Sequence, residues 1–217
     1  MRRLILQEFV SIDGRASGPK DSVDFIPAHS ADDDAFGEEN LAFINSVDTM
    51  LLGSVTYRMF SGYWPNVTEG KEKPFADKFN ALRKVVFSRT LDRAPWGSWG
   101  EATISRNDVA DEVRKLKQSS GKDIVLFGSL SLAKELTNAK LIDEYRLVVL
   151  PVVLGDGREL FGGARQPLEM KLLDEKRFEK GGTLLKYAPA TAAESPTTRA
   201  ATRTTSQDRT SSPGAPA

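Results

Sequence analysis

Short apolar runs alternate with amphipathic segments from the N-terminus to about Tyr187. Runs rich in β-branched and aromatic residues predict strands at Arg3–Ser11, Asp48–Leu52, Lys84–Ser88, Asp123–Phe127 and Tyr145–Val153. Apolar residues at helical spacing predict helices at Asp33–Ser46, Ser54–Phe60, Asn107–Ser119 and Leu130–Asn138. Two further predicted strands, Leu168–Phe178 and Thr183–Tyr187, follow one another with no helix between them.

This alternation predicts an α/β fold of three layers, a mostly parallel central sheet with helices on both faces. The last two strands lack a helical connection, so we expect them to form an antiparallel C-terminal edge. Ligands of such sheets bind at the carboxyl ends of the strands. The turns that follow the strands are therefore the places to look for function.

The composition changes sharply after Ala188. Residues 189–217 contain no Leu, Ile, Val, Met or aromatic residue. Such a segment cannot bury enough apolar area to offset the entropy lost on ordering. We predict one folded domain over residues 1–188 and a disordered tail rich in Ala, Thr, Ser and Pro over residues 189–217. Three tail arginines could contact an acidic partner, although a solvated tail is the simpler interpretation.

Charge and composition exclude several function classes. Lys plus Arg equals Asp plus Glu at 30 each, so the chain has no broad attraction for nucleic acid or anionic membranes. The absence of cysteine excludes disulfides and thiolate chemistry, and a single histidine disfavours a histidine-rich metal site. No apolar run approaches the roughly 20 residues of a membrane span. We expect a cytoplasmic protein with no metal, nucleic-acid or membrane partner.

Two predicted strand-to-helix turns share one pattern. Leu51–Thr56 and Leu126–Ser131 each contain two apolar residues, Gly-Ser, an aliphatic residue and a hydroxyl residue. Glycine permits a tight turn and a close ligand approach, and a helix start offers unpaired N–H groups to an anion. Hydroxyl groups either donate to that anion or cap the helix. The pattern predicts a dinucleotide phosphate site formed by Gly53, Ser54, Thr56, Gly128, Ser129 and Leu130.

A third strand end carries a basic residue. Arg89 follows the predicted strand Lys84–Ser88 and has a hydroxyl residue on each side. Arginine pairs bidentately with phosphate, and the 2′-phosphate of NADP is the natural target. Ser88 and Arg89 therefore join the predicted site, and NADPH is the expected cofactor; a solvated loop arginine is the alternative. The G-x-G-x-x-G fingerprint is absent after the first strand, which disfavours an ordinary Rossmann dehydrogenase.

Five motifs occur in order along the chain: Ser-Ile-Asp-Gly, Leu-Leu-Gly-Ser-Val-Thr-Tyr, Tyr-Trp-Pro, Leu-Phe-Gly-Ser, and Leu-Ile-Asp-Glu leading to Pro-Val-Val-Leu-Gly-Asp-Gly. Together they resemble the dihydrofolate-reductase-like superfamily, and within it the stand-alone proteins similar to the reductase domain of riboflavin biosynthesis. The resemblance covers about Arg2 to Tyr187. It implies an NADPH-binding reductase with cofactor contacts at both glycine turns and at Ser88 and Arg89. It also implies that Asp13 lies beside the substrate and nicotinamide, and such domains often pair as homodimers.

The chain departs from these relatives at three places. The riboflavin-type reductases usually carry Lys-x-Ala just before Ser-x-Asp-Gly, where this chain has Gln7–Val10. They usually have a Glu next to the second glycine turn, where this chain has Leu126–Ser129. The loop after the first strand also lacks the Trp of dihydrofolate reductases proper. The substrate therefore stays open between pterin-like and ribosylaminopyrimidine-like small molecules.

Hydride transfer from NADPH needs positioning and a proton donor rather than a nucleophile. Asp13 is the first candidate, because a carboxyl in a partly apolar cleft can have a raised pKa, although Asp-Gly is also a common turn pair. Tyr63 and Trp64 could stack on a flat substrate or simply pack together. We expect an NADPH-dependent reductase resembling 5-amino-6-(5-phosphoribosylamino)uracil reductase or dihydrofolate reductase. The alternatives are a non-catalytic NADP(H)- or nucleotide-binding protein and an interaction module.

Overall fold

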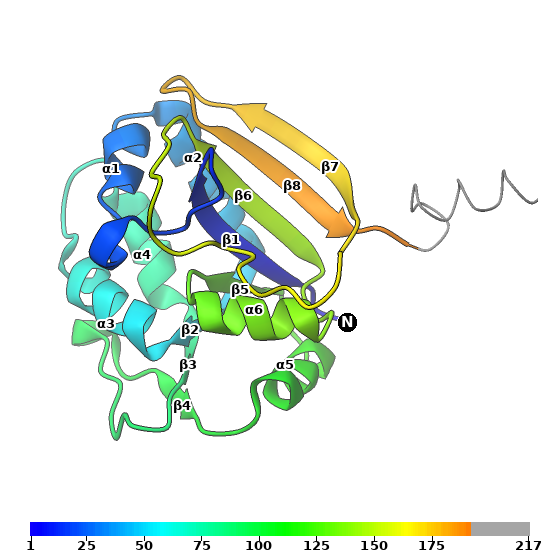
Figure 1. Ribbon diagram of the computed structural model, residues 1–217. Coiled ribbons are helices and arrows are strands. Elements are labelled where there is room, and N and C mark those ends of the chain that lie inside the picture. The colour runs from blue at the N-terminus through cyan, green and yellow to red at the C-terminus, as the bar shows by residue number, and fades with distance from the viewer. Residues whose placement is uncertain (192–217) are drawn as a thin grey trace, which may run out of the picture.

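A computed structural model describes residues 1–191 of the chain. Its centre is one eight-stranded sheet with the strand order β4-β3-β2-β5-β1-β6-β8-β7 (Figure 1). Strands β1 to β6 are parallel, whereas β8 is antiparallel to β6 and β7 is antiparallel to β8. The predicted parallel sheet with an antiparallel C-terminal edge is therefore confirmed.

The elements agree with most of the sequence prediction. The strands are β1 Leu4–Ser11, β2 Val47–Gly53, β3 Arg83–Phe87, β4 Thr103–Ser105, β5 Asp123–Phe127, β6 Glu144–Leu150, β7 Met170–Arg177 and β8 Thr183–Pro189. The helices are α1 Phe25–Ser30, α2 Asp34–Ser46, α3 Ser54–Tyr63, α4 Lys73–Ala81, α5 Val109–Gln118 and α6 Leu130–Asn138, with 3-10 turns η1 Pro19–Asp21, η2 Trp64–Asn66 and η3 Gly97–Trp99. Helices α1 and α4 and strand β4 were not among the predicted elements.

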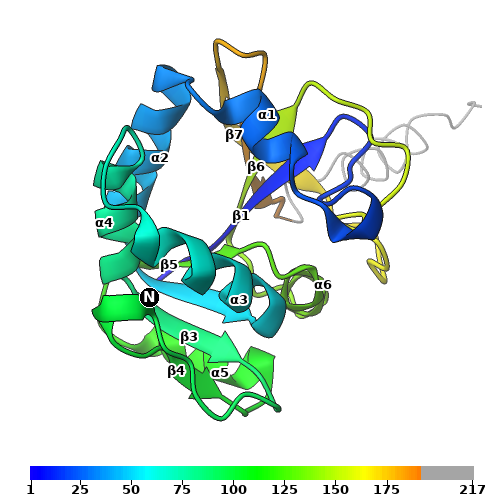
Figure 2. The same cartoon turned by 90° about the vertical axis from the view of Figure 1, so that its left-hand side faces the viewer.

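Each face of the sheet has its own apolar core, because successive residues of a strand point to opposite faces. Leu6 and Leu126 face α5 and α6 and belong to one buried cluster. Ile5 and Val125 belong to the other cluster, together with residues of α2, α3 and the strands beside them. Figure 2 shows the sheet between α2, α3 and α4 on one side and α5 and α6 on the other. The predicted three layers are present.

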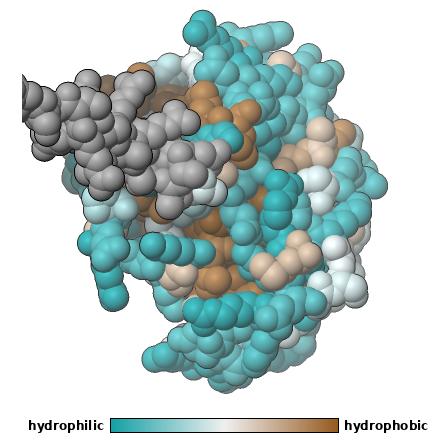
Figure 3. Space-filling model, turned by 90° about the vertical axis from the view of Figure 1, so that its right-hand side faces the viewer, coloured by the Kyte–Doolittle hydropathy of each residue, from teal (hydrophilic) through white to brown (hydrophobic). Residues whose placement is uncertain are grey.

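The antiparallel edge leaves one sheet face less covered. Figure 3 views the molecule from the β7 side, and a band of apolar side chains runs between polar ones. Leu172 of β7 is 46% exposed, and Met170 and Tyr187 are partly buried beside the first cluster. Strand β8 ends at Pro189, one residue beyond the predicted domain boundary. The rest of the predicted tail, residues 192–217, lies outside the described residues.

The parallel strands place several chain turns at one edge of the sheet. Helix α3 follows β2 directly, α6 follows β5 after two residues, and α5 follows β4 after three. The first three residues after β3 and the loop after β1 lie at this same carboxyl edge. Within residues 1–191, no helix combines the length and the apolar character that crossing a membrane requires.

Candidate cofactor site

The two predicted glycine turns contact each other directly. The N–H of Gly53 donates to Oγ of Ser129 over 2.8 Å, across a sequence separation of 76 residues. The N–H of Ser129 donates to Oγ1 of Thr56 over 3.1 Å, and the two hydroxyl oxygens lie 2.9 Å apart. Thr56 is buried and Ser129 is half-buried. The structure therefore joins the starts of α3 and α6 into one hydrogen-bonded unit.

The two glycines are constrained in different ways. A side chain at Gly53 would place its Cβ 3.3 Å from Oγ of Ser129, a tight contact that would press on the link. Gly128 has φ +53° and Ser129 has φ +57°, both in the left-handed region. A non-glycine residue such as Ser129 pays about 1–2 kcal/mol for that conformation. Strain of this kind is typical of ligand-binding turns.

The helix starts at these turns have no side-chain caps. At the N-cap positions, Gly53 for α3 and Ser129 for α6, no side chain accepts a hydrogen bond from the first helical turn. By contrast, Asp108 caps α5 by accepting the N–H of Asp111 over 3.0 Å. The first N–H groups of α3 and α6 thus point toward the carboxyl edge without a side-chain acceptor, which is the arrangement that binds anions.

The Arg89 side chain follows β3 and acts electrostatically on Glu135 of α6. Arg89 is exposed, and within the described part of the chain it forms no hydrogen bond or ion pair. Its charge nevertheless reaches α6: burial and Asp108 raise the pKa of Glu135, and Arg89 opposes that rise. Ser88 fixes the loop, because its hydroxyl accepts the N–H groups of Thr90 and Leu91. The arginine at the end of β3 is free to pair with an anion.

The Asp13 carboxylate is held by the loop that it belongs to and by a second loop. It accepts the hydroxyl of Ser11 over 2.7 Å and the N–H groups of Leu154 and Gly155 over 3.0 Å and 2.9 Å. The Ser11 hydroxyl, followed by these N–H groups, lowers the pKa of Asp13 far below its usual range. An ionised carboxylate suits an anchor between loops better than a proton donor. The catalytic role of Asp13 stays a prediction.

Tyr63 and Trp64 lie at the opposite end of α3 from Ser54. The helix is ten residues long, which corresponds to about 14 Å of rise. Trp64 packs against Phe75 and Phe79 with ring centroids 5.1 Å and 4.9 Å away. The Tyr63 hydroxyl donates to Glu72, and this bond raises the pKa of Tyr63 to about 12. The structure does not bring this pair to the glycine turns, and their substrate contact stays a prediction.

The sequence analysis missed a buried acid beside the second turn. Glu8 of β1 is only 6% exposed, and its Oε2 has no hydrogen-bond partner among the described residues. A Cβ on Gly128 would lie 3.9 Å from that Oε2 atom. The available signal was an acid inside a predicted strand that is otherwise mostly apolar, Leu4–Ser11. The location of Glu8 beside Gly128 depends on the pairing of β1 with β5, which the sequence pattern did not predict.

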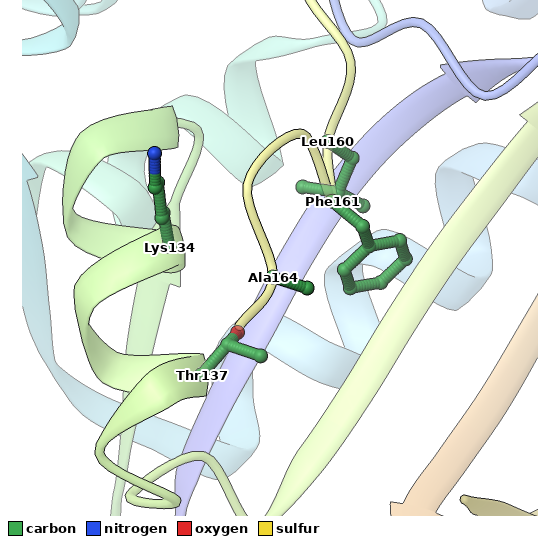
Figure 4. Close-up of a pocket in the computed structure, with 5 residues that line it drawn as sticks. All are labelled: Lys134, Thr137, Leu160, Phe161 and Ala164. Atoms are coloured by element: carbon green, nitrogen blue, oxygen red, sulfur yellow. The ribbon is translucent and has the colours of Figure 1, made fainter. Parts of the chain in front are cut away.

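The space beside α6 is narrow. A cavity of about 10 Å³, enough for roughly one water molecule, is lined by Lys134, Thr137, Leu160, Phe161 and Ala164 (Figure 4). Figure 4 shows Leu160 and Phe161 on the segment after β6, which crosses in front of β1 beside α6. A dinucleotide cannot enter this cavity. Among the described residues, no three acidic or histidine side chains gather as a metal site would require.

Known proteins share both the sequence pattern and the fold. The family model of the RibD C-terminal domain matches residues 2–184. The uncharacterized protein YyaP of Bacillus subtilis is 33% identical over 187 residues, covering 86% of this chain and 94% of that protein.

Solved structures at lower identity show the same fold. A putative riboflavin biosynthesis protein from Shewanella sp. PV-4 has a TM-score of 0.69 at 18% identity, covering 88% of this chain and all of that one. Dihydrofolate reductase from Enterococcus faecalis, complexed with NADP(H), has a TM-score of 0.56 at 14% identity, covering 87% of this chain and 97% of that one. The chain belongs to the RibD C-terminal domain family of reductases, and its fold is that of dihydrofolate reductase.

Proposed function

We propose that this chain is an NADPH-dependent reductase that transfers hydride to a small heteroaromatic substrate, pterin-like or ribosylaminopyrimidine-like. The observation that carries the proposal is the linked pair of uncapped helix starts at Gly53 and Ser129. Two such starts at one sheet edge offer two sets of N–H donors to a pyrophosphate. The site residues are Gly53, Ser54, Thr56, Ser88, Arg89, Gly128, Ser129 and Leu130.

The family supports a reductase and the choice of cofactor. The fold is shared with a dihydrofolate reductase complexed with NADP(H). It is also shared with a Thermotoga maritima deaminase and 5-amino-6-(5-phosphoribosylamino)uracil reductase, at a TM-score of 0.63 and 16% identity over 57% of that chain. Arg89, exposed and unpaired at the end of β3, is the residue that we assign to the 2′-phosphate. A role in riboflavin biosynthesis, a cytoplasmic location and a homodimer remain expectations within this proposal.

The main alternative is an NADP(H)-binding protein without turnover. It is favoured by the ionised state of Asp13, which leaves the predicted proton donor without a proton to give. Nicotinamide fluorescence during titration of the purified protein with NADPH tests both functions together. Saturable binding supports the cofactor assignment, and no binding at high micromolar NADPH overturns it. Oxidation of NADPH with dihydrofolate or the phosphoribosylaminouracil substrate then distinguishes a reductase from a binder.

Replacing Arg89 tests the preference for NADPH over NADH. Loss of a charge-assisted contact with phosphate costs about 1.5–3 kcal/mol of binding free energy. Arg89→Ala should therefore weaken NADPH binding about 10- to 100-fold. Binding of NADH, which lacks the 2′-phosphate, should change less than twofold in the same titration. Arg83→Ala is the matched control, because Arg83 is an exposed arginine at the other end of the same strand. Equal losses for the two cofactors would contradict the 2′-phosphate role.

A further inference from the structure

Glu8 lies where β1 and β5 separate. The two strands pair from Leu4 with Ile124 as far as Gln7 with Phe127. Beyond that pair, β5 turns away at Gly128, whereas β1 continues alongside β6, with Glu8 opposite Leu147. The Glu8 side chain therefore lies at the fork between the two strands, at the carboxyl edge that carries the glycine turns.

The surroundings of Glu8 are apolar. Its neighbours on the same face of β1, Leu6 and Val10, belong to the buried cluster that also contains Leu132 and Leu160. Oε1 accepts the N–H of Phe9 over 3.1 Å, and Oε2 has no partner among the described residues. Burial raises the pKa of Glu8 to about 8, and the Phe9 N–H opposes the rise; no charged side chain of β5, β6 or α6 contributes. At neutral pH this carboxyl therefore holds its proton.

We propose that Glu8 is a catalytic residue, the general acid that protonates the substrate as hydride arrives from NADPH. The proposal rests on the proposed function. Glu8 brings a carboxyl to the second glycine turn from the neighbouring strand. Its unpaired Oε2, close to the backbone of Gly128, is the atom placed to donate.

The step balances with the groups that the proposal names. Hydride leaves C4 of the dihydronicotinamide and bonds to the carbon of a C=N or C=O group on the substrate. The π electrons of that bond move to the nitrogen or oxygen, which takes the proton from Oε2 of Glu8. NADPH is oxidised to NADP⁺, and the substrate is reduced by two electrons. Water then returns a proton to the Glu8 carboxylate.

Gly128 provides the approach to this acid. Gly128 is half-buried and has no side chain of its own to cover Oε2 of Glu8. A Cβ there would lie 3.4 Å from Thr56 and 3.9 Å from Glu8. A flat ring that lies against this glycine would thus come within reach of the carboxyl. The same turn that binds phosphate at Ser129 would then bring the reacting ring to its proton donor.

The first test is Glu8→Gln, which keeps size and removes the acid. General acids contribute 10²- to 10⁴-fold, so kcat with dihydrofolate or the phosphoribosylaminouracil substrate should fall at least about a hundredfold. Binding of NADPH should change less than about threefold. The wild-type kcat should fall as the pH rises through about 8, because the Glu8 carboxyl loses its proton there. The Glu8→Gln variant should not show this pH dependence. Glu144→Gln, a buried glutamate at the opposite edge of the sheet, is the control.

A second measurement does not need turnover. Protein labelled with ¹³C at glutamate carboxyls should show one signal that titrates near pH 8 and is missing from the Glu8→Gln variant. NADP⁺, whose nicotinamide is positively charged, should lower the pKa of that signal by favouring the carboxylate. If NADPH does not bind at all, the proposed function fails. If NADP⁺ binds and the Glu8 titration does not move, or Glu8→Gln keeps wild-type kcat, the role of Glu8 alone is overturned.

Discussion

Backbone N–H groups at the carboxyl edge of the sheet fall into two kinds. At the start of α5, and in the loop at Leu154 and Gly155, aspartate side chains accept them. At the starts of α3 and α6, no side chain does so. The capped groups are occupied by carboxylates from the chain itself. The uncapped ones lie at the two turns that also share a hydrogen-bonded link.

The difference shows how one sheet edge can keep a helix start for a ligand. A cap stabilises the folded chain whether or not a ligand is bound, and its negative charge repels phosphate. An uncapped start gives up that stability and leaves its donors to an anion. Helix α5 therefore serves as an internal comparison for α3 and α6. The next three predictions exchange or remove these acceptors.

Adding a carboxylate to an uncapped start should have the largest effect. Ser54 begins α3, is half-buried, and its hydroxyl has no partner among the described residues. Ser54→Asp should weaken NADPH roughly a hundredfold, because a negative charge within a few ångströms of phosphate repels it. Fluorescence titration measures this loss. Ser54→Asn has the same shape as Ser54→Asp without the charge, and its NADPH affinity should fall less than about fivefold. Equal losses of affinity in the two variants would show that side-chain shape, and not charge, determines NADPH binding here.

Removing the cap of α5 should affect stability and leave cofactor binding alone. Asp108→Ala deletes the acceptor of the Asp111 N–H and should lower the free energy of unfolding by about 1 kcal/mol. Urea denaturation followed by circular dichroism measures it. The affinity for NADPH should stay within twofold of the wild type. A large loss of NADPH affinity would place α5 within the cofactor site and remove the contrast with α3 and α6.

The smallest effect should come from Asp13 and should depend on pH. Its folded pKa lies below the value of an unfolded aspartate, about 3.9, so its carboxylate adds stability above that pH. The contribution is lost as the pH falls further. The difference in unfolding free energy between wild type and Asp13→Asn should therefore be constant above about pH 5 and shrink below about pH 4. Urea denaturation across that pH range measures this difference. A difference in unfolding free energy that grows in acid would contradict the stabilising role of the ionised Asp13 carboxylate.

The sequence predicted the parts of the fold in which local pattern and tertiary packing agree. The bounds of β5 and α6 were predicted to the residue, because each apolar run ends at a clear turn signal. Helix α4 was missed, since it is short, begins with Lys and Pro, and buries only Ala76, Phe79 and Asn80. Strand β4 has three residues and only one neighbour, so its pairing with β3 defines it. Periodicity carries no signal for such an element.

The proximity of the two glycine turns could be predicted from the sequence, whereas the protonation states of the acids near them could not. The two glycine turns stood out by their repeated pattern, and the structure links them through Ser129 and Thr56. The protonation states of the acids were not readable from the sequence. Asp13 is held ionised first by the nearby Ser11 hydroxyl and then by N–H groups from residues about 140 positions away. Glu8 is buried by a fork between strands 120 positions apart in sequence. Burial and hydrogen bonding set a pKa, and both come from the folded chain.

The link between Gly53 and Ser129 has a practical consequence for handling this protein. Its two halves are 76 residues apart and meet only after β2 has paired with β5. A chain that has collapsed without this pairing lacks the complete site that we propose for NADPH. The fluorescence of NADPH bound at the linked turns would therefore be proportional to the number of correctly folded molecules. In a refolding experiment it should rise with the final pairing step, later than the signal from helix formation.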